Sequence, residues 1–146
     1  MLKKSNFFFK SLEKFKTRNA IITENGKYIT YQELLLSSEK ISNKLHAKKK
    51  LIFLLGQNNL ETITGYISFI NKGHSVALID FRINEFFFKK LVKLYKPTYI
   101  FCEKNKIKIK NFYQNILKFK SYILFKRKEN MENILHKDLM LLMSTS

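Results

Sequence analysis

The sequence predicts an α/β fold with a mainly parallel sheet flanked by helices. Three short, mostly apolar runs at residues 51–55, 75–79 and 98–102 show no strict alternation of polar and apolar side chains. Such runs are typical of strands covered on both faces. Segments with helical periodicity join them, and this order implies right-handed crossovers between parallel strands. A chain of 146 residues has the length of one domain, and we see no internal repeat or linker.

The first expected elements are a short helix and a hairpin. Residues 5–16 carry apolar side chains at helical spacing and predict an amphipathic helix. Residues 20–23 and 28–29 predict two strands around Asn25-Gly26, because Asn-Gly is a strong hairpin signal.

A capping box predicts the next helix. The hydroxyl of Thr30 can accept from the backbone of Glu33, and the Glu33 carboxylate can reach back to Thr30. We expect this helix to run to about Ala47. The lysines at residues 48–50 would then suit the negative end of its dipole.

The first crossover helix is expected over residues 59–72. Asn58 and Glu61 have the spacing of a second capping box. Gly73 stands where a left-handed C-cap belongs. The strand over residues 75–79 is then closed by Asp80.

The second crossover helix is expected over residues 84–95, since a helix ends before a pair such as Lys96-Pro97. Beyond residue 106 the pattern is weaker. The expected elements there are an edge strand, a helix, a strand, a loop and a final strand, at residues 106–110, 111–119, 122–125, 131–137 and 139–143.

The charge is strongly positive. Lysine and arginine number 28 against 11 acidic residues, a formal net charge of +17, which raises nucleic acid or an anionic membrane as a partner. Only Arg18, Arg82 and Arg127 are arginine, the side chain that phosphate and base readers favour. The chain is also rich in Asn, Ile, Phe and Tyr, the residues that an AT-rich genome encodes. We therefore interpret the charge as a result of composition and expect no nucleic acid. The alternative stays open: a small lysine-rich α/β module that binds RNA or an anionic surface.

Several classes are excluded by absent features of the sequence. No apolar run reaches the length of a membrane-spanning helix. The apolar stretch at residues 7–9 is too short for a signal peptide. Cys102 is the only cysteine, so no internal disulfide can form. No glycine-rich dinucleotide motif or P-loop supports a stand-alone nucleotide-binding domain. We expect a cytoplasmic location.

Three blocks in order carry a resemblance to a known family. Residues 29–34 read Ile-Thr-Tyr-Gln-Glu-Leu, residues 58–80 form an asparagine-led helix, a glycine and a strand closed by Asp80, and residues 141–146 read Leu-Leu-Met-Ser-Thr-Ser. The chain resembles the N-terminal part of the adenylate-forming enzymes, which include acyl-CoA synthetases, peptide-synthetase adenylation domains and luciferases. It departs from them at Leu78 and Phe81, where the family often has prolines.

The resemblance implies an AMP-binding domain of which residues 1–146 are a part, without a second domain. Thr145 and Ser146 match the start of the family's Ser/Thr/Gly-rich phosphate loop. The implied reaction uses ATP and Mg²⁺ to adenylate a carboxylic acid, with CoA or a carrier protein as the thiol acceptor. The remaining parts of that site lie beyond residue 146, so we expect a truncated, ligase-like chain that is inactive alone. Either a truncated gene product or half of a split enzyme with a complementing polypeptide fits this expectation. No catalytic or metal-binding residue is assigned.

Other chemically competent side chains have structural interpretations. Asp80 is expected to cap the turn into the following helix, and Glu33 and Glu61 to cap helices. Cys102 is interpreted as a buried structural thiol.

Histidines and aromatic residues have similar interpretations. His46, His74 and His136 lack partners at metal-ligand spacing and are expected at the surface or in loops. The run at residues 86–88 hints at membrane contact, but on a helix it places one or two rings in the core. The lysines of residues 106–110 are interpreted as a charged edge strand rather than as a nucleic-acid site.

Overall fold

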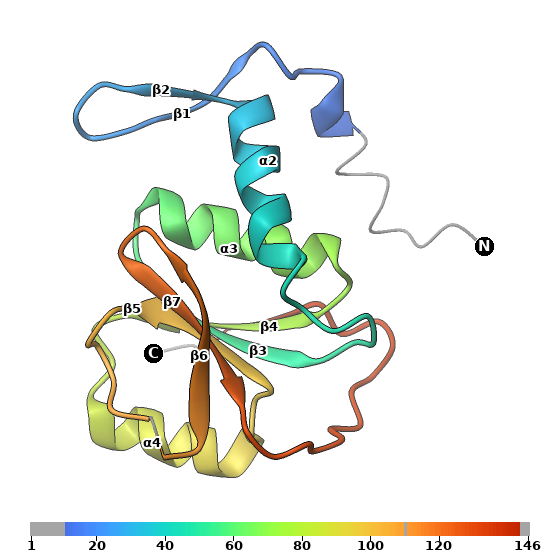
Figure 1. The fold of residues 1–146 in the computed structure, drawn as a ribbon, viewed down its shortest axis with the longest axis vertical. Helices are drawn as coiled ribbons and strands as arrows, with labels where there is room; N and C mark the ends of the chain where they lie inside the picture. Colours follow the sequence, from blue (N-terminus) through green and yellow to red (C-terminus); the bar gives the residue numbers. More distant parts are fainter. Residues whose placement is uncertain (1–10, 110, 144–146) are drawn as a thin grey trace.

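The computed structural model describes residues 11–109 and 111–143. Its main feature is a six-stranded sheet in the order β6-β7-β5-β3-β4-β8, with a separate two-stranded hairpin β1-β2 (Figure 1). The elements are β1 (Asn19–Ile22), β2 (Tyr28–Thr30), α2 (Tyr31–Ser42), β3 (Leu51–Gly56), α3 (Leu60–Asn71), β4 (Ser75–Asp80), α4 (Glu85–Tyr95), β5 (Tyr99–Glu103), β6 (Tyr113–Phe119), β7 (Tyr122–Arg127) and β8 (Leu141–Met143).

The parallel centre of the sheet confirms the predicted fold class. β3 pairs in parallel with β4 and with β5, and β8 pairs in parallel with β4. The edge formed by β6 and β7 is antiparallel, so the complete sheet is mixed. The final strand, expected over residues 139–143, is present at its last three residues.

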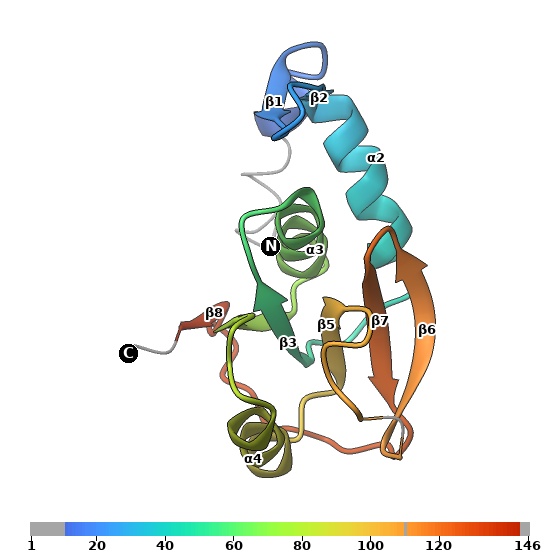
Figure 2. The ribbon, with the colours of Figure 1, turned by 90° about the vertical axis from the view of Figure 1, so that its left-hand side faces the viewer.

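Helices cover both faces of the sheet, with α3 on one side and α4 on the other (Figure 2). Alternate residues of β3 therefore enter different clusters. Ile52 and Leu54 pack with α2 and α3. Leu51, Phe53 and Leu55 pack with α4. Each such side chain contributes about 1.5–3 kcal/mol when fully buried, which explains why an unbroken apolar run forms this strand.

The hairpin and the capping box form as predicted. The β1-β2 pair is antiparallel, and the backbone N–H of Glu33 donates to Thr30 Oγ1 at 3.2 Å while the Thr30 N–H donates to Glu33 Oε2 at 2.8 Å. The expected helix end was wrong, since α2 ends at Ser42 rather than near Ala47. The chain then turns, and the His46 N–H donates to Tyr99 Oη at 3.0 Å. The three lysines at residues 48–50 consequently do not cap the helix.

The first crossover helix is capped one residue later than predicted. Asn59, not Asn58, accepts from the Thr62 N–H at 2.9 Å. Glu61 is not a capping residue, because its Oε1 accepts from Ser121 Oγ at 2.8 Å. Gly73 has φ +84°, which confirms the left-handed C-cap.

The second crossover helix is confirmed. Asn84 caps α4, which ends at Tyr95, and Lys96 takes a left-handed conformation directly before Pro97. Phe88 is fully buried, whereas Phe86 and Phe87 are exposed, so one ring of the run enters the core. No helix of the described residues is both long and apolar enough to cross a membrane.

The structure differs from the prediction near the N-terminus and in the segment after β5. Residues 5–10 of the predicted first helix lie outside the described residues, and residues 11–13 are helical before turns begin. Residues 106–109 form no strand, because Ile107 and Ile109 are buried in the cluster on the α4 side instead of alternating along an edge. Residues 113–119 form β6 rather than a helix, since they pair with β7. β7 and the loop over residues 131–137 agree with the prediction.

Candidate functional site

The connections after β3 and β4 leave the sheet in opposite directions. The chain after β3 passes to α3 on one face, and the chain after β4 passes to α4 on the other (Figure 2). Ligands of open α/β sheets bind at such a switch point, outside the carboxyl ends of the strands. A cavity of about 570 Å³ lies there, lined by Gly56, Gln57, Asn58, Thr62, Leu78, Ile79, Asp80, Phe81, Arg82 and Met143. We name it the strand-end cavity.

Gly56 lets Leu78 and Thr62 pack closely against the end of β3, at the wall of the strand-end cavity. A Cβ atom at this position would lie 2.7 Å from Leu78 Cδ1 and 3.1 Å from Thr62 Cγ2. The carbonyl of Gly56 accepts from the Phe81 N–H at 3.1 Å. The glycine thus allows the two divergent connections to begin close together.

A chain of hydroxyl groups holds the connection after β3. The Gln57 N–H donates to Thr62 Oγ1 at 3.1 Å, and Thr62 Oγ1 lies 3.3 Å from Tyr122 Oη. Tyr122 in turn donates to the carbonyl oxygen of Leu55 at 3.0 Å. Since Tyr122 belongs to β7, a strand of the antiparallel edge of the sheet helps to hold this loop in position.

Asp80 and Arg82 form the charged rim of the strand-end cavity. Arg82 donates from its backbone N–H to Asp80 Oδ1 at 2.8 Å and from Nη2 to Oδ2 at 2.6 Å. The hydrogen bonds from the Arg82 side chain lower the pKa of Asp80 to about 2, and the same contact raises the pKa of Arg82. The predicted turn-capping role of Asp80 is confirmed.

The amino end of the sheet contains a buried polar cluster instead. His74, predicted at the surface or in a loop, lies in the loop between α3 and β4 but is fully buried, so a surface position is wrong. Its Nδ1 accepts from the Lys50 N–H at 3.0 Å, while Nε2 has no hydrogen-bond partner among the described residues. Burial, with the charge of Lys72 next in size, lowers the pKa of His74 to about 4. His46 and His136 are exposed as expected.

Cys102 also agrees with its interpretation. The thiol is fully buried on the α4 side of the sheet. Burial raises its pKa to about 12. A thiol held protonated in this way is a poor nucleophile, so Cys102 is a structural side chain.

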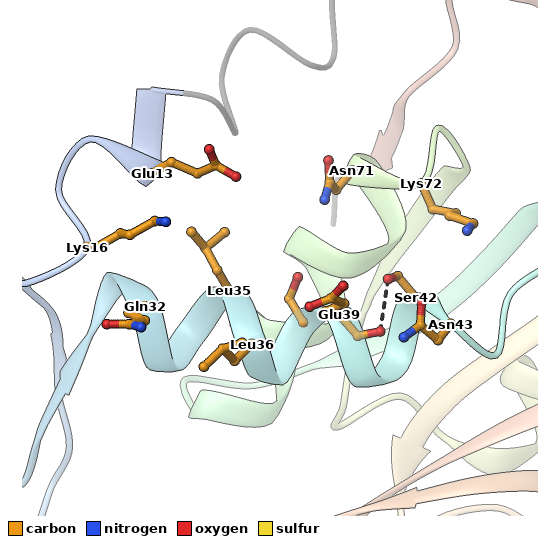
Figure 3. Close-up of a pocket in the computed structure, with 11 residues that line it drawn as sticks. Glu13, Lys16, Gln32, Leu35, Leu36, Glu39, Ser42, Asn43, Asn71 and Lys72 are labelled. Carbon is orange, nitrogen blue, oxygen red and sulfur yellow. Dashed lines mark hydrogen bonds between the residues drawn. The ribbon is translucent and has the colours of Figure 1, made fainter.

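A second cavity, of about 650 Å³, lies between residues 11–16, α2 and the end of α3 (Figure 3). Its charged side chains are of both signs, with Glu13 and Glu39 beside Lys16 and Lys72. Ser42 Oγ on its wall donates to the Glu39 carbonyl at 3.0 Å. It is remote from the carboxyl ends of the strands, and we place the candidate site at the strand-end cavity.

Comparison with solved structures identifies the fold. MatB from Rhodopseudomonas palustris in its apo form matches with a TM-score of 0.58 and 16% identity, over 66% of this chain and 20% of that chain. An NRPS protein containing adenylation and PCP domains, bound to a vinylsulfonamide inhibitor, matches with a TM-score of 0.58 and 22% identity, over 66% and 17%. The anthranilate CoA ligase AuaEII in complex with anthranoyl-AMP matches with a TM-score of 0.53 and 13% identity, over 60% and 18%.

The chain has the fold of the N-terminal subdomain of the adenylate-forming enzymes. This confirms, at the level of fold, the resemblance carried by the three sequence blocks. The chain spans about a fifth of the length of these structures. No protein-family model and no curated protein matches the sequence.

The residues assigned to the phosphate loop, Thr145 and Ser146, lie outside the described residues. The described chain reaches Met143, which lines the strand-end cavity at the end of β8. β8 therefore ends at the strand-end cavity, two residues before Thr145 in the sequence.

The described residues do not fit a magnesium site. No group of three or more His, Cys, Asp or Glu side chains among them is arranged to hold a metal ion. Both carboxylate oxygens of Asp80 are already bonded to Arg82. We therefore derive no chemical step through Mg²⁺ or through ATP phosphates from these residues.

Sequence reasoning missed three residues that shape the site: Gly56, Thr62 and Tyr122. Gly56 follows directly on the apolar run 51–55, and a glycine ending a buried strand was a usable signal. Thr62 and Tyr122 lie 60 residues apart in the sequence. No local pattern indicates that contact.

Proposed function

We propose that this chain is the N-terminal part of an ATP-dependent ligase that adenylates a carboxylic acid. In that reaction the carboxylate attacks the α-phosphate of ATP, pyrophosphate leaves, and an acyl-adenylate forms. A thiol then takes the acyl group, with CoA or a carrier protein as the acceptor. The proposed location is the cytoplasm.

One observation carries the proposal: the strand-end cavity lies at the switch point of an adenylate-forming fold and receives the end of β8. A phosphate loop that follows β8 would enter the space in which open α/β sheets bind their ligands. Backbone N–H groups of such a loop are well suited to phosphate oxygens. The AMP adduct in the anthranilate CoA ligase supports acyl-adenylate chemistry for this fold.

The chain alone is proposed to be inactive. Adenylation requires a cradle for the β- and γ-phosphates and a metal ion to neutralise developing charge. Among the described residues the rim of the strand-end cavity offers one carboxylate and one guanidinium, bonded to each other. Lysines elsewhere on the surface can attract ATP, but they do not orient it for attack.

The coding DNA downstream of codon 146 tests the proposal. We expect one reading frame to continue after Thr145-Ser146 with a glycine, two hydroxyl residues and a second glycine, followed by several hundred residues' worth of coding sequence or its remnants. Downstream DNA that encodes no such loop in any frame would contradict the assignment of this chain to a ligase.

A further inference from the structure

The solvent face of α4 carries large apolar side chains that the fold does not use. Phe88 and Val92 anchor the helix in the core. On the other side, Phe86 is 62% exposed, Phe87 59% and Leu94 70%. Figure 1 shows α4 at the opposite end of the molecule from the β1-β2 hairpin, on the outer side of the sheet.

Lysines share this face with the aromatic rings. Lys90 and Lys93 follow Phe86 at spacings of four and seven residues, so the three lie on one stripe of the helix. The Lys90 Nζ atom is 4.4 Å from the centre of the Phe86 ring and 5.9 Å from that of Phe87. The Lys90 ammonium group therefore lies beside the rings, and Lys93 is on the same stripe of the helix.

The charge around α4 is almost entirely positive. Residues 81–96 contain four lysines and one arginine against a single glutamate. That glutamate, Glu85, is paired with Lys89 at 2.8 Å. In the segments that flank α4 in sequence, Lys106 Nζ lies 5.6 Å from the centre of the Phe81 ring. Arg82 is paired in the same way with Asp80. An approaching surface would therefore meet the exposed rings beside Lys90 and Lys93, for which no ion pair is found among the described residues.

We propose that α4 docks on the surface of an anionic lipid bilayer, with Phe86, Phe87 and Leu94 entering the boundary between headgroups and acyl chains. Interfacial helices combine an apolar face with lysines that reach the lipid phosphates. Anionic leaflets attract such lysines. At 1.5 Å per residue the helix is about 16 Å long, which suits a helix lying in the interface plane. The proposal does not depend on the ligase function.

Charge and side-chain chemistry favour lipid over nucleic acid or protein. This face carries lysine and no arginine, whereas base and phosphate readers favour arginine. Phe86 and Phe87 meet edge to face, with ring centres 5.7 Å apart, so they form a compact apolar projection rather than two separate stacking platforms. A protein groove would need matched acidic side chains, whereas an anionic bilayer supplies the negative charge over its entire surface.

Flotation of the 146-residue chain with vesicles provides the test, because aggregates sink while vesicle-bound protein floats. We expect the chain to float with vesicles of phosphatidylcholine and phosphatidylserine and to remain below with phosphatidylcholine alone. Flotation should weaken as salt is added, since salt screens the lysines.

Two double variants and two matched controls locate the contact. F86S/F87S should lower the partition coefficient at least about tenfold, because the variant lacks the two rings whose transfer from water into the bilayer favours binding. K90E/K93E should lower it by roughly as much through repulsion. The controls L36S/I134S and K44E/K118E remove exposed apolar or basic side chains from other elements and should float like the wild type. Circular dichroism checks that every variant is folded.

Four results would overturn the proposal. The first is equal flotation of F86S/F87S and the wild type. The second is an equal loss in the matched controls, which would make the binding a property of total charge. The third is that the α4 variants lose binding to a single-stranded RNA that the wild type binds, while they float like the wild type. This result would assign the face to nucleic acid. The fourth is that the α4 variants differ from the wild type in oligomeric state, measured by gel filtration, while they float like the wild type. This result would assign the α4 face to a second copy of the chain.

Discussion

The two ends of the parallel sheet differ in the burial and in the bonding partners of their polar side chains. At the amino end, His74 and Ser75 are fully buried and are bonded to neighbouring segments of the chain. At the carboxyl end, Asp80 and Arg82 are exposed and bonded mainly to each other. The same strands therefore end in a closed, packed layer on one side and in the strand-end cavity on the other.

The closed end ties together segments that are far apart in the sequence. The Lys50 N–H donates to His74 Nδ1, and Ser75 Oγ donates to the Leu139 carbonyl at 2.8 Å. The His46 N–H donates to the hydroxyl of Tyr99. Buried polar groups of this kind are costly when a partner is lost, so this end contributes to stability, whereas the open end has room for a ligand.

Lowering the pH should reduce the stability of the fold through His74 at the closed end, and this is the largest effect that we expect. His74 has a pKa of about 4 in the folded chain and 6.5 as its ordinary value. As pH falls below the ordinary value, the unfolded chain takes up this proton before the folded chain does. The stability that neutral His74 provides is thus complete above the ordinary pKa and is lost as pH falls toward the folded pKa. A difference of this size corresponds to about 3 kcal/mol.

Urea unfolding of the wild type and of His74→Asn, from neutral pH to about pH 4, measures this effect. The asparagine oxygen can still accept from Lys50 but does not titrate. The wild type should lose about 3 kcal/mol more than the variant over this interval. Exposed carboxylates such as Asp80, whose pKa is about 2, are common to both proteins. Parallel stability curves would show that His74 is not protected from protonation.

Two glycines sharpen the contrast between packed and open regions. A Cβ at Gly65 in α3 would lie 2.6 Å from Phe101 Cε1, and Phe101 is fully buried. Gly65→Ala should therefore destabilise the fold by about 1–3 kcal/mol, less the gain of up to about 1 kcal/mol from alanine in a helix.

Gly56→Ala is the matched substitution at the open end. Its Cβ would meet Leu78 Cδ1 at 2.7 Å, but this is the tip of a half-buried side chain beside the strand-end cavity. Leu78 has room to move, so the cost should be less than half of that at Gly65. Equal losses in urea unfolding would mean that the carboxyl end is packed as tightly as the interior.

The β8 edge of the open end should bind a hydrophobic dye. Leu141, Leu142 and Met143 are all exposed, and β8 is the last strand of the described sheet. Exposed apolar edges promote association. The chain should enhance the fluorescence of the neutral dye Nile red or aggregate, and Leu142→Ser should reduce this signal while Ile134→Ser, at another exposed position, leaves it unchanged. A monomer that unfolds cooperatively and binds no dye would contradict this prediction.

The sequence was most informative where local signals coincide. Thr30 and Glu33 form a capping box, Gly73 ends a helix, and the run 51–55 is apolar throughout. Each of these signals depends on neighbours within a few residues. Together they predicted the parallel centre of the sheet and the position of Asp80.

Long-range contacts explain where the sequence was misleading. The hairpin of β6 and β7 turns at Lys120, which has φ +50°, without the glycine or asparagine that usually indicates such a turn. Residues 106–109 alternate like a strand, but their isoleucines serve a loop over the core. His74 has no local sign of burial, because its partner Lys50 precedes it by 24 residues. Tyr122 at the candidate site is inaccessible to sequence reasoning for the same reason.

The central proposal is that the open end of the described residues contributes only part of a carboxylate-adenylating site. Carboxylate-dependent exchange of pyrophosphate into ATP, measured on the 146-residue chain with a panel of carboxylic acids, tests it most directly. Each missing transition-state contact costs about 3–4 kcal/mol, and about 1.4 kcal/mol is a factor of ten in rate. We predict no exchange above background, and any weak, salt-sensitive ATP binding should be unchanged by Thr145→Ala or Ser146→Ala. Exchange that Thr145→Ala abolishes would show a working site in this chain and contradict the account.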